Sequence, residues 1–380
     1  MPPKATEGPG RGRRARAKTS RTQSNAEKTR FRVFTRRAFH RLLIGAGVGA
    51  AGLGAAWATL IRMPGSDHEG PLPSLTNAQR ATADRLESDV RVLAHQHDQR
   101  HTYNEASTRA AVMYLARRLA RTGLEPSISE HQFAGSPTPC INIDATVDGT
   151  HAPSPIVVIG AHYDTYCMTP GADDNASGVA GVLELAARFK KRPAAIPIRF
   201  ELYGNEEPPH FMTERMGSAL AADAARARGD DITAMINLEM IGFYDDAPGS
   251  QTYPMPISLF YPDTGDFVAI VGNVRSVGLV RRFVRDWRSA INFPIEGAAL
   301  PEAVPGIGFS DHRSFWEAGY RAVMVTDTAF YRNKNYHTAG DLPETLDYER
   351  MARVIDGVET LVRKLVSSKN LHTQTGHFDP

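Results

Sequence analysis

The sequence contains little cysteine, and this scarcity excludes two kinds of architecture. Among 380 residues, only Cys140 and Cys167 carry a thiol. Two cysteines can form at most one disulfide, so a disulfide-stapled scaffold is excluded, although pairing of these two residues stays open. No Cys-x-x-Cys pattern occurs, so a structural zinc site of that type is excluded as well.

Charge is unevenly distributed, although the formal net charge of the whole chain is only +2. Residues 1–62 contain 14 Lys and Arg against 2 Asp and Glu, which leaves 30 basic and 40 acidic residues for the rest of the chain. The body is therefore acidic, which argues against nucleic acid as a partner. The hydrophobic share of 42% is enough for a sizeable core.

The N-terminal residues change composition twice. Residues 1–34 are rich in Pro, Gly, Ser, Arg and Lys, which predicts a disordered basic tail. Arg36 and Arg37 then precede an uncharged run over residues 42–61, long enough to span a bilayer. Residues 35–62 are similar to a twin-arginine export signal, so we expect either a cleaved signal or a membrane anchor. A buried Gly- and Ala-rich helix of the fold is the alternative.

Both a signal and an anchor would place the body outside the cytoplasm, because positive charge before an apolar segment keeps the tail inside. The expected location is periplasmic or extracellular, with membrane contact only through residues 42–61 if they are not cleaved. Residues 63–76 are rich in Pro, Gly and Ser and are expected to be a linker, and residues 371–380 a tail.

Predicted helices and strands alternate along the body. Helices are expected over residues 77–95 and 105–121, followed by strands over 127–133 and 140–147. Further strands are expected over 156–160, 198–203, 233–238, 267–271 and 322–326, and helices over 176–189, 217–228, 277–290 and 348–366. This alternation is typical of an α/β fold with a mostly parallel mixed sheet and helices on both faces.

Histidines and carboxylates follow several of the predicted strands, where ligands gather in open α/β sheets. The candidates for metal binding are His162, Asp174, Glu207, Glu239 and His337, with Glu206 to spare. Two imidazoles and three carboxylates suit a pair of divalent ions. If Asp174 bridges them, each ion has an open position for water, as in catalytic zinc sites. The alternative is an acidic cluster without metal, whose carboxylates would raise one another's pKa.

Six short motifs, taken together and in this order, resemble metallopeptidase family 28. This family comprises di-zinc aminopeptidases, glutamate carboxypeptidases and glutaminyl cyclases. The motifs are His162-x-Asp164, residues 171–178, Asn205-Glu206-Glu207, residues 237–240, Ser310-Asp311-His312 and Tyr336-His337-Thr338. The resemblance covers roughly residues 80–368. It implies a single zinc-exopeptidase-like domain, so residues 77–370 are expected to form a di-zinc peptidase domain.

The resemblance also assigns the metal ligands. His162 and Glu239 would hold one Zn²⁺, Glu207 and His337 would hold the other, and Asp174 would bridge the two. The expected content is therefore two Zn²⁺ per chain, with other divalent ions as alternatives.

Two catalytic roles follow from the same resemblance. Asp164 would orient His162, as carboxylates commonly do for metal-bound imidazoles. Glu206 would act as general base towards a metal-bridging hydroxide. A cis peptide bond is implied between Asp174 and Asn175.

The implied activity is that of a zinc-dependent exopeptidase, first of all an aminopeptidase that hydrolyses the N-terminal peptide bond of a peptide or acyl-amide substrate. Aminopeptidases of the family often have Asp where this chain has Glu239, so a carboxypeptidase or amidase stays an alternative. A glutaminyl cyclase-like transferase and an inactive binding ectodomain are further alternatives. The presence of His162, and of every ligand, argues against these two.

Other residues are weaker candidates. Ser310, Asp311 and His312 are consecutive and cannot form a catalytic triad, so we expect them beside the metal site or the substrate. Several residues have both a functional and a structural interpretation. Asp341 and Asp347 are expected to cap or start the last helix rather than to act in chemistry. Tyr331 and Arg332 either contact substrate or lie at the rim or in the core, and Phe309, Phe315 and Trp316 line either a side-chain pocket or the core. His95, His97 and His101 are expected to be exposed helix-end histidines, with metal binding as the alternative.

Overall fold

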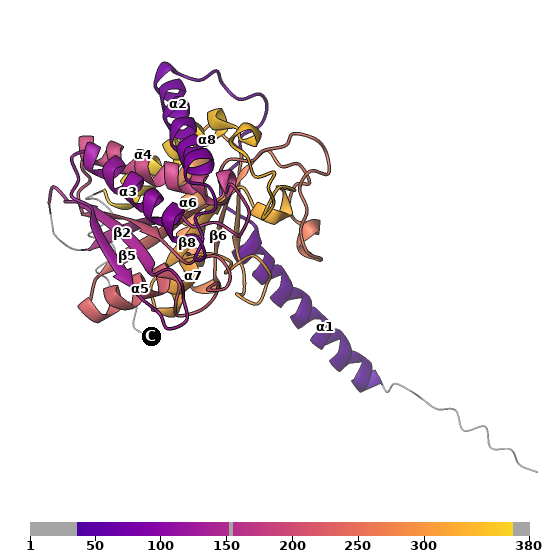
Figure 1. The fold of residues 1–380 in the computed structure, drawn as a ribbon. Coiled ribbons are helices and arrows are strands. Elements are labelled where there is room, and N and C mark those ends of the chain that lie inside the picture. Colours follow the sequence, from indigo (N-terminus) through magenta and orange to yellow (C-terminus); the bar gives the residue numbers. More distant parts are fainter. Residues whose placement is uncertain (1–35, 152–154, 368–380) are drawn as a thin grey trace, which may run out of the picture. The chain divides into compact units, whose positions relative to one another are not determined.

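The computed structural model describes residues 36–151 and 155–367 (Figure 1). The predictions for residues 1–34 and 371–380 fall outside these described residues. The chain divides into two units, Met1–Gly52 and Leu53–Pro380, and the catalytic candidates all belong to the second.

The N-terminal apolar run forms α1 (Arg36–Ala56), which continues into a π-helical segment over Trp57–Ile61. Residues Arg37–Ile61 are long and apolar enough to cross a membrane, and none of their most apolar stretch is buried in the structure. By length and composition the helix fits an export signal and a membrane anchor equally.

Eight strands form one mixed sheet in the order β1-β2-β4-β3-β5-β8-β6-β7. Their bounds are β1 (Ser127–His131), β2 (Cys140–Val147), β3 (Ile156–His162), β4 (Ile198–Tyr203), β5 (Ile232–Glu239), β6 (Val268–Gly272), β7 (Ile295–Ala299) and β8 (Ala322–Thr326). The pairs β4–β3, β3–β5, β5–β8 and β6–β7 are parallel, and the other three pairs are antiparallel. The predicted mixed α/β sheet is confirmed.

Helices cover both faces of this sheet (Figure 1). One face packs against α2 (Asn77–Arg91), α3 (Glu105–Arg121), α4 (Gly178–Lys191), α6 (Val277–Arg288) and α8 (Tyr348–Leu365). The other packs against α5 (Gly217–Arg228) and α7 (His312–Glu317). Strand β3 is buried along its whole length, as its run of Ile and Val requires in a central strand covered on both sides.

Residues 63–76 contain no helix or strand, yet they lie against the body. Met63 and Leu75 are buried, and the Asp67 carboxylate accepts a hydrogen bond from the backbone N–H of Ile295 at 3.0 Å. The segment ends at Thr76, whose side chain accepts from the backbone N–H of Gln79 and caps α2. This stretch is therefore ordered by packing.

The three strands β4, β3 and β5 position the candidate metal ligands. Strand β3 lies between β4 and β5 in parallel register, with His162 opposite Tyr203 and Gly160 opposite Asn237. The carboxyl ends of these strands therefore meet at one edge of the sheet, and the segments that follow them converge there.

Candidate metal centre

Two clusters of potential metal ligands lie at this edge. His162, Asp174 and Glu239 form one, and Asp174, Glu207 and His337 form the other. Within each cluster the ligand atoms lie within 4.8 Å of one another, and Asp174 belongs to both. Among the described residues these are the only groups of three or more with such geometry. All five predicted ligands are thus brought together, although they are spread over residues 162–337 of the sequence.

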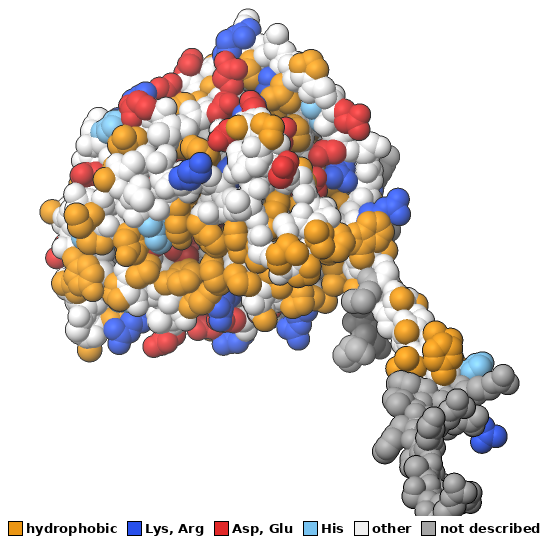
Figure 2. All heavy atoms as spheres, turned by 90° about the vertical axis from the view of Figure 1, so that its right-hand side faces the viewer, with side chains coloured by type: hydrophobic (Ala, Val, Ile, Leu, Met, Phe, Trp, Pro, Cys, Tyr) orange, Lys and Arg blue, Asp and Glu red, His pale blue; other side chains and the backbone are white. Residues whose placement is uncertain are grey.

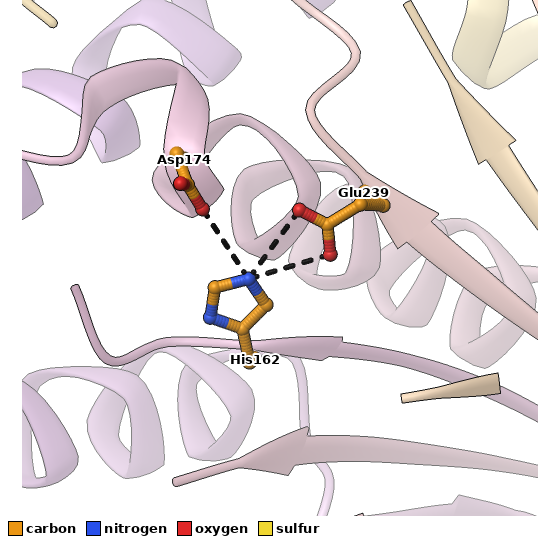
Figure 3. A group of neighbouring side chains, drawn as sticks. All are labelled: His162, Asp174 and Glu239. Carbon is orange, nitrogen blue, oxygen red and sulfur yellow. Dashed lines mark hydrogen bonds and ion pairs between the residues drawn. The ribbon is translucent and has the colours of Figure 1, made fainter. Parts of the chain in front are cut away.

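The first cluster surrounds the Nε2 atom of His162 (Figure 3). This atom lies 3.4 Å from Oδ1 of Asp174 and 3.3 Å from Oε2 of Glu239. The second surrounds Nε2 of His337, which lies 3.2 Å from Oδ2 of Asp174 and 3.1 Å from Oε1 of Glu207. The two oxygens of Asp174 therefore face different imidazoles, which is the arrangement that a bridging carboxylate needs.

The buried carboxyl and imidazole groups of the site favour the binding of cations. Burial raises the pKa of Glu207, with the Asp174 carboxylate beside it, to about 8. Burial works against the charged form of Asp174 as well, but hydrogen bonds from His162 and His337 hold its pKa below the ordinary range. Burial opposes protonation of His337, and these carboxylates nevertheless raise its pKa to about 9. Imidazole nitrogens and carboxylate oxygens are zinc ligands, so this donor set fits divalent ions that would replace the protons.

The loop that carries Asp174 is shaped by its neighbours in sequence. Gly171 has a left-handed backbone (φ 62°), and a Cβ there would lie 2.2 Å from Cγ2 of Thr165. The Asp174–Asn175 peptide bond is cis, as the resemblance implied. The Asn175 side chain donates to the carbonyl of Leu238 at 2.9 Å and accepts from the N–H of Met240 at 3.0 Å, which ties the loop to the end of β5.

Asp164 contacts both His162 and the turn that carries Glu206 and Glu207. Its carboxylate accepts from the backbone N–H groups of Glu206 at 3.1 Å and Glu207 at 3.0 Å. Nδ1 of His162 lies 3.5 Å from the Asp164 carboxylate but 3.1 Å from its backbone carbonyl. Asp164 therefore positions both the imidazole and the Glu206–Glu207 turn, the first partly through its main chain.

Glu206 belongs to neither cluster, although it lies beside both. Its Oε2 atom is 3.9 Å from Nε2 of His162. Burial raises the pKa of the Glu206 carboxyl well above its ordinary value; His162 opposes this shift, and the nearby Glu207 and Glu239 add to it. A proton-accepting carboxylate that is not itself a ligand is thus available at the centre.

Comparison with known proteins agrees with this geometry. The sequence model of the family described as Peptidase family M28 matches residues 142–362. The uncharacterized protein YfbL of Escherichia coli K12 is 39% identical over 300 residues, 77% of this chain and 90% of the relative. This chain belongs to peptidase family M28. It is therefore a hydrolase of the metallopeptidase class.

Some more distant relatives of this M28 chain have names that state an activity. Leucine aminopeptidase 1 of Coccidioides posadasii is 29% identical over 228 residues, 55% of this chain and 52% of the relative, so the chain spans about half the length of that protein. A solved structure of BSAP, a zinc aminopeptidase from Bacillus subtilis, superposes with a TM-score of 0.58 at 15% identity, over 76% of this chain and 96% of the other. That likeness confirms the predicted fold.

Of the triplet Ser310-Asp311-His312, only the serine contacts a candidate ligand of the M28 site. Its hydroxyl donates to Oε2 of Glu239 at 2.5 Å and accepts from the Asn237 side chain at 2.7 Å. His312 donates from Nε2 to the carbonyl of Ile307. Asp311 is fully buried, and among the described residues its carboxylate has no hydrogen-bond partner, so burial raises its pKa to about 7.

Two positioning residues of the M28 site were missed or misplaced by the sequence reasoning. Asp341 was expected to cap a helix, but its carboxylate accepts from the backbone N–H groups of Asp173 at 2.8 Å and Asp174 at 3.1 Å. Arg100 was not singled out. Its guanidinium is fully buried and donates to backbone carbonyls, including those of Tyr163 and Gly171. Nothing in the local sequence of either residue indicates these distant partners.

The remaining candidates are structural. Asp347 caps α8 by accepting from the N–H of Arg350, as expected. Arg332 is buried and donates to the carbonyl of Phe267. Phe315 and Trp316 lie in the core. The histidines at 95, 97 and 101 join neither ligand cluster, and Cys140 and Cys167 are both unpaired.

A cavity of about 110 Å³ opens from the M28 metal centre, where Glu239 and Tyr336 contribute to its wall. Its lining is mostly apolar and includes Phe309 and Phe330, which are partly exposed. Hydrophobic side chains also gather in a broad band on the face of the body shown in Figure 2. The centre is thus bordered by apolar surface on which a substrate side chain can pack.

Proposed function

We propose that this M28 chain is a zinc-dependent exopeptidase, and specifically an aminopeptidase that holds two divalent ions. The observation that carries the proposal is the sharing of Asp174, whose two carboxylate oxygens face two imidazoles, each with a carboxylate of its own. A pair of imidazoles and three carboxylates is the donor set expected for a two-metal hydrolase.

In this proposal His162 and Glu239 would hold one ion, His337 and Glu207 would hold the other, and Asp174 would be shared by both. When bound, the ions would supply Lewis acidity that polarises the scissile carbonyl and lowers the pKa of a water molecule. The protein contributes the positions of the ligands, which the hydrogen bonds of Asp164 and Ser310 fix before substrate arrives.

Glu206 acts as general base. Its carboxylate takes a proton from the attacking water and then gives that proton to the leaving amine. Burial supports this role, because a carboxyl whose pKa is raised holds a proton more readily near neutral pH. The backbone of Glu206 is held by Asp164, and the preceding Asn205 adopts a left-handed conformation (φ 60°) that turns the chain into the site.

The name of the fungal relative supports an aminopeptidase over the carboxypeptidase and amidase alternatives. The presence of His162 in the first cluster likewise disfavours a cyclase-like site with a single zinc. Hydrolysis of peptides with a free N-terminus, compared with N-blocked peptides of the same sequence, separates the alternatives. Preferential cleavage of the blocked peptides would contradict the aminopeptidase assignment.

The decisive variant for the general base is Glu206→Gln. It should retain both ions by elemental analysis and lose activity about 10²–10⁴-fold, since the amide cannot accept the proton. Glu214→Gln, on the exposed part of the same loop, serves as the matched control and should keep full activity. Substantial activity in Glu206→Gln with both ions bound would exclude this role.

We also propose that residues 77–370 form the peptidase domain and that the N-terminal apolar helix carries it out of the cytoplasm, either as a cleaved signal or as an anchor. The length and apolar composition of Arg37–Ile61 support this. N-terminal sequencing of the protein recovered from a producing cell distinguishes the two forms. An intact chain found soluble in the cytoplasm would contradict both.

A further inference from the structure

The cavity that begins at the metal centre follows one row of residues across the sheet. Glu239 pairs with Thr326, Thr326 with Ala269, and Ala269 with Glu296. Directly paired residues point to the same face of a sheet, and all four line the cavity. Three strand spacings place the two glutamates about 14 Å apart along this row. The cavity thus has a carboxylate of the metal site at one end and a second carboxylate at the edge strand.

Glu296 is unusual for such an apolar cavity. Its side chain is 23% exposed, and its carboxylate makes no hydrogen bond within the described part of the chain. The nearest cation is Arg288, whose NH2 atom lies 3.8 Å from Oε2 of Glu296. The same guanidinium lies 3.8 Å from the Asp67 carboxylate and donates to the carbonyl of Ile295. One cation therefore serves two carboxylates and donates a hydrogen bond to neither of them.

The other polar groups at this end are also able to accept hydrogen bonds. Tyr261 donates its hydroxyl proton to the carbonyl of Gly297, so the lone pairs of its oxygen stay available. The hydroxyl of Tyr253 is buried and has no partner among the described residues. The rings of Tyr253 and Tyr261 lie 5.6 Å apart, and both line the cavity together with Glu296. A ligand group that donates several hydrogen bonds would satisfy all three oxygens.

We propose that this cavity binds the side chain of the substrate's N-terminal residue and that Glu296 selects a long cationic side chain, that of Lys or Arg. This inference rests on the proposed aminopeptidase function. The aliphatic stem would pack between apolar walls such as Val304 and Met324, and the charged head would reach the acceptors at the edge strand. The apolar wall alone would favour Leu. The Glu296 carboxylate, which accepts no hydrogen bond among the described residues, adds the preference for charge.

The test compares substrates that differ only at the end of the N-terminal side chain. Peptide amides that begin with Lys, norleucine, Leu and Glu are assayed on the full chain loaded with zinc. Norleucine has the straight stem of Lys without its ammonium group, so the Lys-to-norleucine ratio of kcat/KM isolates the charge. We expect this ratio to exceed one by about tenfold or more in the wild type.

Glu296→Gln should bring the Lys-to-norleucine ratio of kcat/KM close to one, because the amide carries no charge. Glu296→Lys should reverse the charge preference towards N-terminal Glu. Glu125→Gln, at an exposed site far from the cavity lining, is the matched control and should keep the wild-type ratio. Thermal unfolding of each variant shows that it is folded.

Binding gives a second readout that does not depend on turnover. Calorimetry with free L-lysine and L-norleucine should show tighter binding of lysine to the wild type, and loss of that difference in Glu296→Gln. Robust aminopeptidase activity with a Lys-to-norleucine ratio of one or less, or a ratio unchanged in Glu296→Gln, overturns the role of Glu296 and leaves the proposed function standing. Absence of any N-terminal hydrolysis overturns the proposed function, and with it this inference.

Discussion

The two halves of the candidate metal centre are built from the same ligand types but are held in different ways. His162 is 1% exposed and is oriented by a hydrogen bond from Nδ1 to the Asp164 carbonyl. The His337 side chain is 23% exposed and is sandwiched between two rings. Tyr166 stacks on it at 4.2 Å and Tyr336 at 3.8 Å between ring centroids. The imidazole of one half is therefore enclosed within the protein, whereas the imidazole of the other half is partly exposed.

The carboxylates of the two halves are both buried, but they too are held in different ways. Glu239 accepts hydrogen bonds from the side chains of Ser310 and Asn175, at 2.5 and 3.3 Å. Glu207 is fixed through its backbone N–H by Asp164. His337 itself has a left-handed backbone (φ 57°), which is uncommon for a residue other than glycine. We infer that the His162 half is the more rigid ion site and the His337 half the one that exchanges with solvent.

Removing Asp174, the ligand shared by the two halves, should abolish metal binding in both and with it the difference between them. Asp174→Ala deletes an oxygen from each half, so we expect loss of metal from both and a fall in kcat/KM of about 10³-fold or more. Elemental analysis after dialysis measures the bound ions. Retention of two ions per chain by the variant would contradict the bridging role.

Stepwise chelation should show how strongly the two halves differ in metal affinity. With limiting chelator we expect the ion of the exposed His337 half to leave first, so that metal loss from the wild type has two phases. His337→Ala should bind one ion that resists the chelator, whereas His162→Ala should lose its remaining ion readily. Simultaneous release of both ions from the wild type would show that the halves are equivalent.

Weakening the hydrogen bonds by which Asp341 holds the backbone of Asp173 and Asp174 should have an intermediate effect. Asp341→Asn replaces one of two accepting oxygens with an amide, so we expect metal affinity or activity to fall about 10- to 100-fold. Asp347→Asn is the matched control, because Asp347 caps α8 and lies 3.5 Å from the Arg350 guanidinium, away from the candidate ligands, and the amide still caps well. If both variants keep wild-type metal affinity, Asp341 contributes to folding alone.

Loss of stacking on the exposed half should have the smallest effect. Tyr166→Ala removes one ring from His337 and should weaken the second ion by about 0.5–1.5 kcal/mol, whereas Tyr166→Phe keeps the ring and should be neutral. Zinc titration monitored by competition with a chromophoric chelator measures this. An equal loss in both variants would assign the effect to the hydroxyl instead.

Most of the sheet was predictable from the sequence, because its strands are short segments rich in aliphatic and aromatic residues between turns, and β3 begins with an uninterrupted apolar run. Strand β7 and helix α7 were not predicted. The β7 sequence, Ile295-Glu-Gly-Ala-Ala299, has one β-branched residue, and it becomes a strand because β6 offers it a free edge. Helix α7 has only six residues, too few for a clear helical period.

The five candidate ligands could be named from the sequence because the short motifs around them are local in sequence. The residues that position these side chains, Arg100 and Asp341, were not predictable, since their roles depend on contacts with distant parts of the sequence. Arg100 reaches Gly171 across 71 positions, and Asp341 reaches Asp173 across 168. A lone Arg or Asp in the sequence does not indicate which backbone groups it will meet once the fold brings these segments together.

The most direct test of the metal centre is a crystal structure of the zinc-loaded protein with anomalous diffraction measured on both sides of the zinc edge. We expect two zinc peaks, one between His162 and Glu239 and one between His337 and Glu207, with one Asp174 oxygen directed at each. A single peak, or two peaks that Asp174 does not contact, would contradict the shared-carboxylate centre.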